Sequence, residues 1–306
     1  MIIITVGKSY IDIDGYASAI AYRELLKMKG IEAKFVSDAV LNYSITKSLL
    51  DIPYNLDKKE ITNDDKFIIL DLSNKDYFPD YVKEESIMEI IDHHPGFEDY
   101  WQRRIGNSSI IEEIGSVATI IFEKYEQSNL LDKMNKDVAK LLMAAILDNT
   151  LNFTAAITKE RDIIAYKKLS AIANDYNYAE TYFKEVQNHI EDNLEKSIKN
   201  DIKIQYINEC LPDVFGQLTM WDPQTLLNKN DNIKKIMNSY GSEWMMNLIS
   251  LKDNTSCIMY SDDNVKTNLE GFLDCSIGNG CLLLKPAMLR KEIMKKALQS
   301  KNIVKK

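Results

Sequence analysis

Short apolar segments alternate with helix-like segments through the first half of the chain, and this alternation restricts the folds available to it. The strand-like segments are rich in β-branched side chains and lie at residues 2–6, 34–36, 67–72 and 87–91. The helix-like segments carry apolar residues on one face and lie at residues 17–29, 116–127 and 136–147. Strands separated by helices form parallel sheets with helices on both faces. We therefore predict an α/β N-terminal domain with a mainly parallel sheet.

The remaining chain predicts a second, smaller α/β domain. With 306 residues, the chain is long enough for two domains of ordinary size. Residues 160–200 are polar and helix-prone, so we place the first domain at 1–187, a linking helix at 188–200 and the second domain at 201–306. The strands of the second domain are expected at residues 202–207, 215–220, 246–251 and 256–261.

Composition indicates the cellular compartment of the protein and argues against membrane and nucleic-acid partners. No apolar run reaches the roughly 18 residues of a membrane span, and the N-terminus lacks a basic segment, so we expect a cytoplasmic protein without membrane contact. The formal net charge of −8 argues against a stable nucleic-acid partner. The cysteines show no CxxC spacing, and we expect them to be reduced and buried: Cys210, Cys257, Cys275 and Cys281.

Acidic and histidine side chains follow the predicted strands at the points where those strands end. They are Asp12 and Asp14 after the first strand, Asp71 at the end of a later one, and Asp92, His93 and His94 at the end of another. Ligands bind at the carboxyl ends of the strands in open parallel sheets, so these side chains should converge on one edge. Asp148 closes an apolar helix, where an unpartnered charge is costly to bury and a metal would satisfy it.

Several of these features also have a purely structural explanation. Asp12 or Asp14 could cap the helix that follows, and Ser116 could cap the helix at 116–127 instead of opening a phosphate-binding helix N-terminus. Adjacent histidines preceded by an aspartate are harder to explain structurally. Imidazole binds divalent metals well, and an acidic neighbour fixes its tautomer.

Together these side chains form an oxygen-rich ligand set with one imidazole: Asp12, Asp14, Asp71, His93 and Asp148. Such a set suits Mn²⁺, Co²⁺ or Mg²⁺, and the absence of thiolate from it makes structural zinc a poor fit. Two such cations can clamp the attacking and leaving oxygens of a phosphoryl transfer. The ligand set therefore indicates hydrolysis of a phosphate compound.

These blocks, in this order, resemble the DHH phosphoesterase superfamily, which is named for the triplet at residues 92–94. Over residues 1–165 the matching blocks are Asp12-Ile13-Asp14, Asp71, Asp92-His93-His94, Gly115-Ser116-Val117-Ala118-Thr119, and Asp148 with Thr150. The second half resembles the branch of manganese-dependent family II inorganic pyrophosphatases, exopolyphosphatases and prune proteins. Its matching pieces are Asp201-Ile202-Lys203, residues 215–218 and Arg290-Lys291.

The resemblance implies a role for each matched residue. Two metal ions, with Mn²⁺ as the preferred metal, would be held by Asp12, Asp14, Asp71, His93 and Asp148. Asp71 would bridge them. His94 and Asp92 would form the catalytic pair, with His94 contacting the substrate phosphate or assisting the leaving group. The substrate-binding residues would be Lys8, Ser116, Lys203, Arg290 and Lys291. Lys8 stands where the pyrophosphatases carry a histidine ligand, and the eukaryotic exopolyphosphatases and prune proteins also lack that histidine.

The resemblance implies hydrolysis of a phosphoanhydride bond in inorganic pyrophosphate or short polyphosphate by a water that two metals activate. The partner would be a small anionic phosphate compound, with a homodimer left open. One alternative is a phosphodiesterase of short oligonucleotides or dinucleotides, with Trp221, Tyr240 or Trp244 as a platform for a base. An alternative of another class is a catalytically weakened binding or regulatory protein, marked by Lys8.

Overall fold

The computed structural model describes residues 1–58, 60–278 and 280–300, so residues 301–306 of the expected second domain lie outside the described residues. The chain forms two compact units, the first of Met1–Phe153 with Ile157–Ala179 and the second of Thr154–Ala156 with Glu180–Lys306. This division lies earlier in the chain than the boundary we expected at residue 187. Gln187 accepts the backbone N–H of Asp222 at 2.9 Å, a contact inside the second unit.

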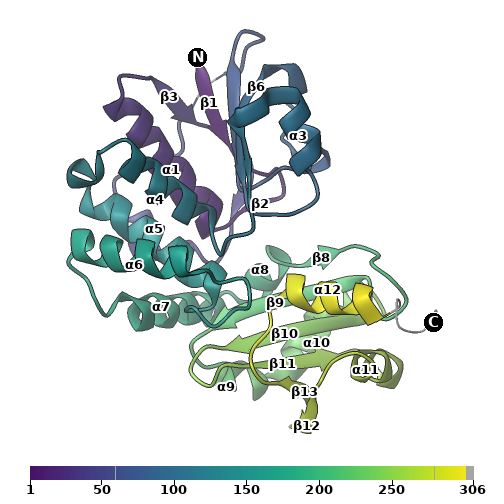
Figure 1. The fold of residues 1–306 in the computed structure, drawn as a ribbon. Coiled ribbons are helices and arrows are strands. Elements are labelled where there is room, and N and C mark those ends of the chain that lie inside the picture. Colours follow the sequence, from purple (N-terminus) through teal and green to yellow (C-terminus); the bar gives the residue numbers. More distant parts are fainter. Residues whose placement is uncertain (59, 279, 301–306) are drawn as a thin grey trace. The chain divides into compact units, whose positions relative to one another are not determined.

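The first unit is built on a parallel sheet of five strands in the order β3-β1-β5-β6-β7 (Figure 1). The strands are β1 (Ile2–Thr5), β3 (Ala33–Phe35), β5 (Lys66–Leu70), β6 (Ile87–Asp92) and β7 (Ser109–Ile111). The central strands are buried on both faces, as parallel strands covered by helices are. The predicted parallel sheet is confirmed. β7 adds an edge strand whose three residues are too few to carry a pattern in the sequence.

Helices cover both faces of this sheet, as predicted (Figure 1). On one face α1 (Ile13–Met28) and α4 (Val117–Gln127) are backed by α5 (Lys136–Thr150) and α6 (Glu160–Ala173), and α3 (Glu98–Ile105) lies on the other. Trp101 of α3 packs in a buried cluster with Phe67 and Ile69 of β5. Its indole N–H donates to the carbonyl of Ser73 at 2.7 Å, which satisfies the polar end of a buried ring.

Short elements complete the first unit. A separate parallel pair joins β2 (Tyr10–Ile11) to β4 (Val40–Leu41). The short helical segments are α2 (Lys47–Leu50), η1 (Lys75–Tyr77), η2 (Glu84–Ser86), η3 (Gly106–Ser108) and η4 (Leu131–Lys133).

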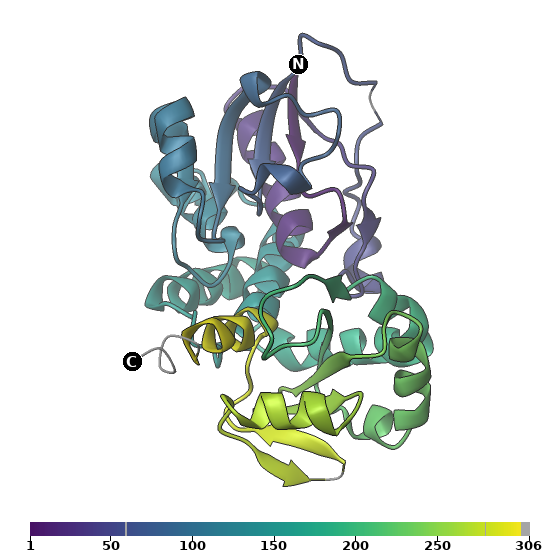
Figure 2. The same ribbon diagram turned by 90° about the vertical axis from the view of Figure 1, so that its right-hand side faces the viewer.

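The second unit is built on a mixed sheet of six strands in the order β12-β13-β11-β10-β9-β8. The strands are β8 (Lys203–Ile204), β9 (Val214–Met220), β10 (Trp244–Ser250), β11 (Thr255–Tyr260), β12 (Ser276–Gly278) and β13 (Cys281–Leu284). Only β9 and β10 pair in parallel. The four expected strands are present, and β12 and β13 extend the sheet at the edge coloured yellow in Figure 2.

Two helices stand where we expected one linking helix. α7 (Tyr178–Asp192) and α8 (Leu194–Lys199) are separated at Asn193, whose φ and ψ of −134° and 41° are not helical. The other helices of the second unit are α9 (Gln224–Leu227), α10 (Asn230–Asn238), α11 (Asp263–Glu270) and α12 (Arg290–Ser300). Within the described ranges, no helix is both long enough and apolar enough to cross a membrane.

Cys257 and Cys281 form a disulfide that joins β11 to β13. The expectation that all four cysteines are reduced is therefore wrong for this pair, while Cys210 and Cys275 are free. The two bonded residues are 24 positions apart in the sequence, and only the antiparallel pairing of Ile258 with Leu282 brings them together. The sequence carried no sign of it, because β13 itself was not predicted.

Candidate metal centre

Strands β5 and β6 deliver four of the predicted site residues to one edge of the first sheet: Asp71, Asp92, His93 and His94. Leu70 pairs with Ile91, so the two strands end at the same level, and the backbone N–H of Asp71 donates to the carbonyl of Ile91 at 2.9 Å. Asp71 has a φ of 58°, in the left-handed region that a non-glycine residue rarely adopts. Backbone strain of this kind clusters at functional sites, so it adds to the case for Asp71 as a site residue.

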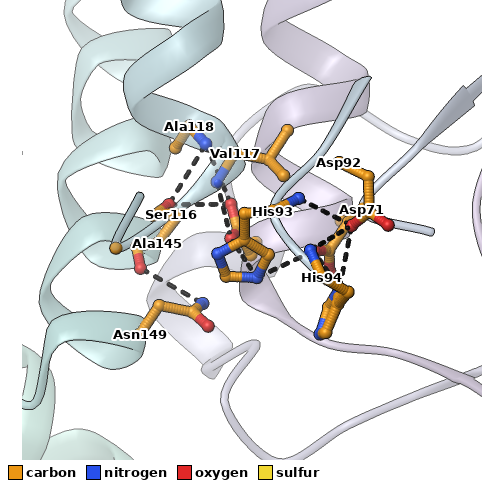
Figure 3. A network of polar contacts seen from close by, with 12 residues as sticks. Asp71, Asp92, His93, His94, Ser116, Val117, Ala118, Ala145 and Asn149 are labelled. Carbon is orange, nitrogen blue, oxygen red and sulfur yellow. Dashed lines mark hydrogen bonds and ion pairs between the residues drawn. The ribbon is translucent and has the colours of Figure 1, made fainter. Parts of the chain in front are cut away.

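His93 is buried, and its ring is held from one side. Its Nδ1 lies 3.1 Å from the carbonyl oxygen of Ile114. A carbonyl only accepts, so Nδ1 carries a proton, and the lone pair of the neutral ring is then on Nε2. Nε2 lies 3.3 Å from Oδ1 of Asp71 (Figure 3) and 3.9 Å from Oδ2 of Asp14. Three atoms that bear lone pairs therefore face one another, and a cation bound between them would offset their mutual repulsion.

Asp92 fixes the position of His94. One of its oxygens, Oδ1, accepts the backbone N–H of His93 at 2.7 Å and that of His94 at 3.1 Å, and lies 2.8 Å from Nδ1 of His94. Burial alone would raise the pKa of Asp92, but the charge of a protonated His94 and the hydrogen bond to that ring hold the pKa of Asp92 below its usual value. The side chain of His94 is half exposed. Its Nε2, the ring nitrogen that Asp92 does not hold, can therefore meet a ligand from solvent.

Asp14 lies in the first turn of α1 and is completely buried against the start of α4. Its Oδ1 accepts the hydroxyl of Ser116 at 2.8 Å and the N–H of Ala118 at 3.0 Å, and its Oδ2 accepts the N–H of Val117 at 2.9 Å. We expected these donors to bind a phosphate, but they bind this carboxylate. Burial, followed by the neighbouring charge of Asp12, raises the pKa of Asp14 to about 7 in spite of those bonds.

Asp12 and the end of α5 complete the predicted ligand set. Asp12 caps α1, with its Oδ1 accepting the N–H of Gly15 at 3.1 Å, so the structural explanation applies to this residue. Asp148 lies in the last turn of α5 and is partly buried. Its neighbour Asn149, which our sequence analysis passed over, directs its side chain toward the His93 ring in Figure 3. Adjacent helical residues differ by about 100° in direction, and only the structure separates them.

The donor set at this edge fits a divalent cation. One ligand atom each from Asp71, His93 and His94 lies within 4.8 Å of the other two. Asp14 adds a carboxylate whose raised pKa a nearby cation would lower again. Carboxylate oxygens with imidazole nitrogen are the ligands that Mn²⁺ and similar ions accept in proteins.

Lys8 makes a surface ion pair in the structure. Its Nζ lies 3.1 Å from Oδ1 of Asp80, its side chain is about half exposed, and its backbone N–H donates to the carbonyl of Tyr77 at 3.0 Å. Its place beside a first metal position stays a prediction.

Arg290 of the second unit is buried and engaged within that unit. Its guanidinium lies 2.5 Å from Oδ1 of Asp201 and donates to the carbonyls of Asp201 and Phe215 at 2.8 and 3.1 Å. It thereby ties the start of α12 to the sheet, and we no longer expect it to bind phosphate. Lys203 is exposed on β8 and Lys291 is half-buried, so they remain the cations of this unit expected to meet a substrate.

Trp244, one of the three aromatic side chains considered as a platform for a base, lies in the core of the second unit. It is fully buried, and its Nε1–H donates to Asn238 at 2.7 Å.

Comparison with known sequences identifies the first domain. Residues 2–146 match the DHH family, N-terminal domain. The chain is 30% identical over 173 residues to a probable manganese-dependent inorganic pyrophosphatase of Bacillus licheniformis, an alignment that covers 53% of this chain and 52% of the relative. It is 24% identical over 280 residues to one from an Exiguobacterium species, covering 87% and 83%. With the first of these relatives, the chain spans about half of the relative's length.

Comparison with solved structures confirms the α/β fold. The putative family II inorganic pyrophosphatase of Methanococcus jannaschii superposes with a TM-score of 0.71 at 20% identity, over 99% of this chain and 100% of that one. An exopolyphosphatase-related protein from Bacteroides fragilis gives a TM-score of 0.54 at 14% identity, over 100% and 94%. At identities this low, the similarity supports a shared fold but not a shared activity.

Proposed function

Residues 2–146 of this chain belong to the DHH family, and from that membership we propose that the protein is a metal-dependent hydrolase of phosphoanhydride bonds in inorganic pyrophosphate or short polyphosphate. The observation that carries the proposal is the convergence of Asp71 Oδ1, His93 Nε2 and Asp14 Oδ2 at the carboxyl end of a parallel sheet. The relatives named as manganese-dependent pyrophosphatases support both the metal and the substrate class.

The residues that would hold the metals are Asp12, Asp14, Asp71, His93 and Asp148. When bound, two divalent cations, Mn²⁺ by preference, supply charge neutralisation at the phosphate oxygens and lower the pKa of the attacking water. The protein contributes a rigid set of ligands. The N-terminus of α4 fixes Asp14, and the Ile114 carbonyl fixes His93 in the tautomer with a free lone pair on Nε2.

His94 is the residue we assign to proton transfer. Asp92 holds its Nδ1 at 2.8 Å, which leaves Nε2 directed toward ligand. We assign to Nε2 of His94 the donation of a proton to the departing phosphate, with the ring oriented by the buried carboxylate of Asp92. The proton is then replaced from solvent, to which the half-exposed ring has access.

In the second unit we assign neutralisation of substrate phosphate to Lys203 and Lys291. Both are flexible ammonium groups that act as point charges and can adapt to phosphates of different chain length. Arg290 does not bind phosphate in this proposal. Its bond to Asp201 instead stabilises the part of the second unit that carries Lys203 and Lys291.

A substrate panel tests this function directly. Phosphate release would be measured with Mn²⁺ on pyrophosphate, tripolyphosphate, long-chain polyphosphate and a dinucleotide, with an Asp71→Asn sample as the control for contaminating phosphatases. We expect turnover of pyrophosphate or tripolyphosphate that the Asp71→Asn control lacks. Turnover of the dinucleotide alone would establish the phosphodiesterase reading, and no turnover of any substrate would favour a binding protein.

A further inference from the structure

Asp162 is a fully buried carboxylate to which the proposed function assigns no role. It lies in the first turn of α6, and both of its oxygens are engaged. Oδ2 accepts the backbone N–H of Gly115 at 3.0 Å and that of Lys159 at 2.8 Å. Oδ1 accepts the hydroxyl of Thr119 at 2.6 Å. The carboxylate therefore holds the segment between residues 115 and 119 at both of its ends.

The peptide group between Ile114 and Gly115 connects Asp162 to His93. Its N–H donates to Asp162, and its C=O lies 3.1 Å from Nδ1 of His93. A peptide group is planar, with its N–H and C=O pointing in opposite directions, so one rigid unit joins the carboxylate to the imidazole. A charged acceptor on the N–H also polarises the carbonyl and strengthens its bond to Nδ1–H.

The rest of the same segment holds Asp14. Ser116, Val117 and Ala118 lie between the two anchors, and each donates to the Asp14 carboxylate (Figure 3). Displacing the segment would therefore move the partners of two ligands of the proposed metal centre together.

We propose that Asp162 is a positioning residue of the metal centre, acting on His93 through the peptide group of Ile114 and Gly115, and on Asp14 through the anchored start of α4. It touches neither metal nor substrate. The inference rests on the proposed function only where metal affinity is measured, since the orientation of His93 can be observed without metal.

Helix capping alone does not account for these contacts. A cap needs only the local N–H of Lys159, whereas Asp162 also takes donors from Gly115 and Thr119, more than 40 residues earlier in the chain. The approach is so close that a Cβ at Gly115 would lie 2.5 Å from Oδ2 of Asp162 and 2.6 Å from Cγ2 of Thr150. Residue 115 must be glycine for the peptide group to reach the carboxylate.

Asp65 provides a matched control within the same unit. It is also a buried aspartate that accepts a threonine hydroxyl and a backbone N–H, both from Thr62, at 3.0 and 2.8 Å. It lies just before β5, at the opposite end of that strand from Asp71. Asp65→Asn should therefore cost stability without affecting the metal centre.

The first test is the tautomer of His93 in metal-free protein, read from imidazole ¹⁵N shifts. The chain has three histidines, and a His93→Gln sample assigns the signal. In the native protein we expect a protonated Nδ1. In Asp162→Asn only a neutral oxygen is left to accept the N–H of Gly115, so the charged anchor of the peptide group is lost and the signal should shift toward a mixture of tautomers. Thr119→Val, which removes a single hydroxyl, should give a smaller shift in the same direction, and Asp65→Asn none.

The second test is Mn²⁺ affinity by titration calorimetry. Removing a partner that orients a ligand typically weakens metal binding by about 10–100-fold, and we expect a rise in Kd of that size in Asp162→Asn and a smaller rise in Thr119→Val. If Asp162→Asn does not fold, Thr119→Val decides. Native His93 signals and native Mn²⁺ affinity in the folded variants would overturn the inference. If the native protein itself fails to bind Mn²⁺, the proposed function is wrong, and the tautomer measurement still decides the role of Asp162.

Discussion

Oδ1 of the buried Asp92 lies 2.8 Å from Nδ1 of His94 and also accepts the backbone N–H groups of His93 and His94. One carboxylate oxygen thus sets the geometry of the whole triplet. The two histidines that follow are placed differently, since His93 is buried against Asp71 and His94 is half exposed. The arrangement supports the proposed roles of His93 as a metal ligand and His94 as a proton donor.

Substitution of the two histidines should therefore have different effects on metal affinity and turnover. His93→Ala removes a ligand, and we expect Mn²⁺ affinity to fall by about 100-fold or more, beyond the loss typical of a supporting partner. His94→Ala should keep Mn²⁺ affinity and lower kcat by about 10²-fold, the usual size of a lost general acid. The third histidine, His189 on α7, is the control, and its alanine variant should behave as native protein. Equal loss of metal from His93→Ala and His94→Ala would contradict this division.

The end of α5 offers two neighbouring candidates for one ligand position. The sequence favours Asp148, whereas the side chain of Asn149, whose Nδ2 donates to the carbonyl of Ala145 at 3.4 Å, extends toward the His93 ring in Figure 3. Asp148→Ala should weaken Mn²⁺ binding, because it removes a predicted ligand. Asn149→Asp should tighten it by about tenfold, since a charged oxygen replaces a neutral one next to the cation. Calorimetry checks both. Native affinity in Asp148→Ala together with tighter binding in Asn149→Asp would transfer the ligand role to position 149.

Position 8 bears on substrate preference. A protonated lysine cannot coordinate a metal, so Lys8→His should tighten Mn²⁺ binding in the absence of substrate and shift preference toward pyrophosphate. Asp80→Ala is the control, because an exposed ion pair such as Lys8–Asp80 contributes little and its loss should leave metal binding unchanged. Unchanged metal affinity and an unchanged substrate profile in Lys8→His would place position 8 outside the site.

Arg290 should matter for stability. Arg290→Ala leaves Asp201 buried without its charged partner, a change that typically costs about 3–5 kcal/mol. We expect earlier urea unfolding and faster hydrogen exchange in β9 and α12. Lys291→Ala, one residue along, should instead raise KM for pyrophosphate with little change in exchange. Native stability in Arg290→Ala with a raised KM would return Arg290 to the substrate-binding residues.

The convergence of the acids and histidines could be predicted from sequence because it depends on few facts. Short apolar strands alternating with helices specify a parallel sheet, and residues directly after such strands meet at one edge. Asp71 and the triplet at 92–94 follow their strands immediately, so small errors in strand ends did not matter. β5 and β6 are indeed neighbours that end at the same level.

What could not be predicted depends on which partner a group finds in space. The sequence showed that the helix opened by Ser116 has free amides, but its acceptor, Asp14, follows from the packing of α1 against α4. Arg290 looked like a phosphate ligand in the sequence. Its burial against Asp201 could not be seen there, because that contact arises only when the second sheet forms. Asp162 carried no motif at all, since its partners Gly115 and Thr119 lie in a different part of the chain.

The proposed function requires that the site of Asp71, His93 and Asp14 is a divalent-metal centre on which hydrolysis depends. The most direct measurement is pyrophosphate hydrolysis by metal-free protein during titration with Mn²⁺, alongside calorimetry on the same sample. We expect no turnover after chelation, recovery as Mn²⁺ binds, and neither binding nor recovery in His93→Ala. Full turnover in a chelated sample that contains no metal would contradict it.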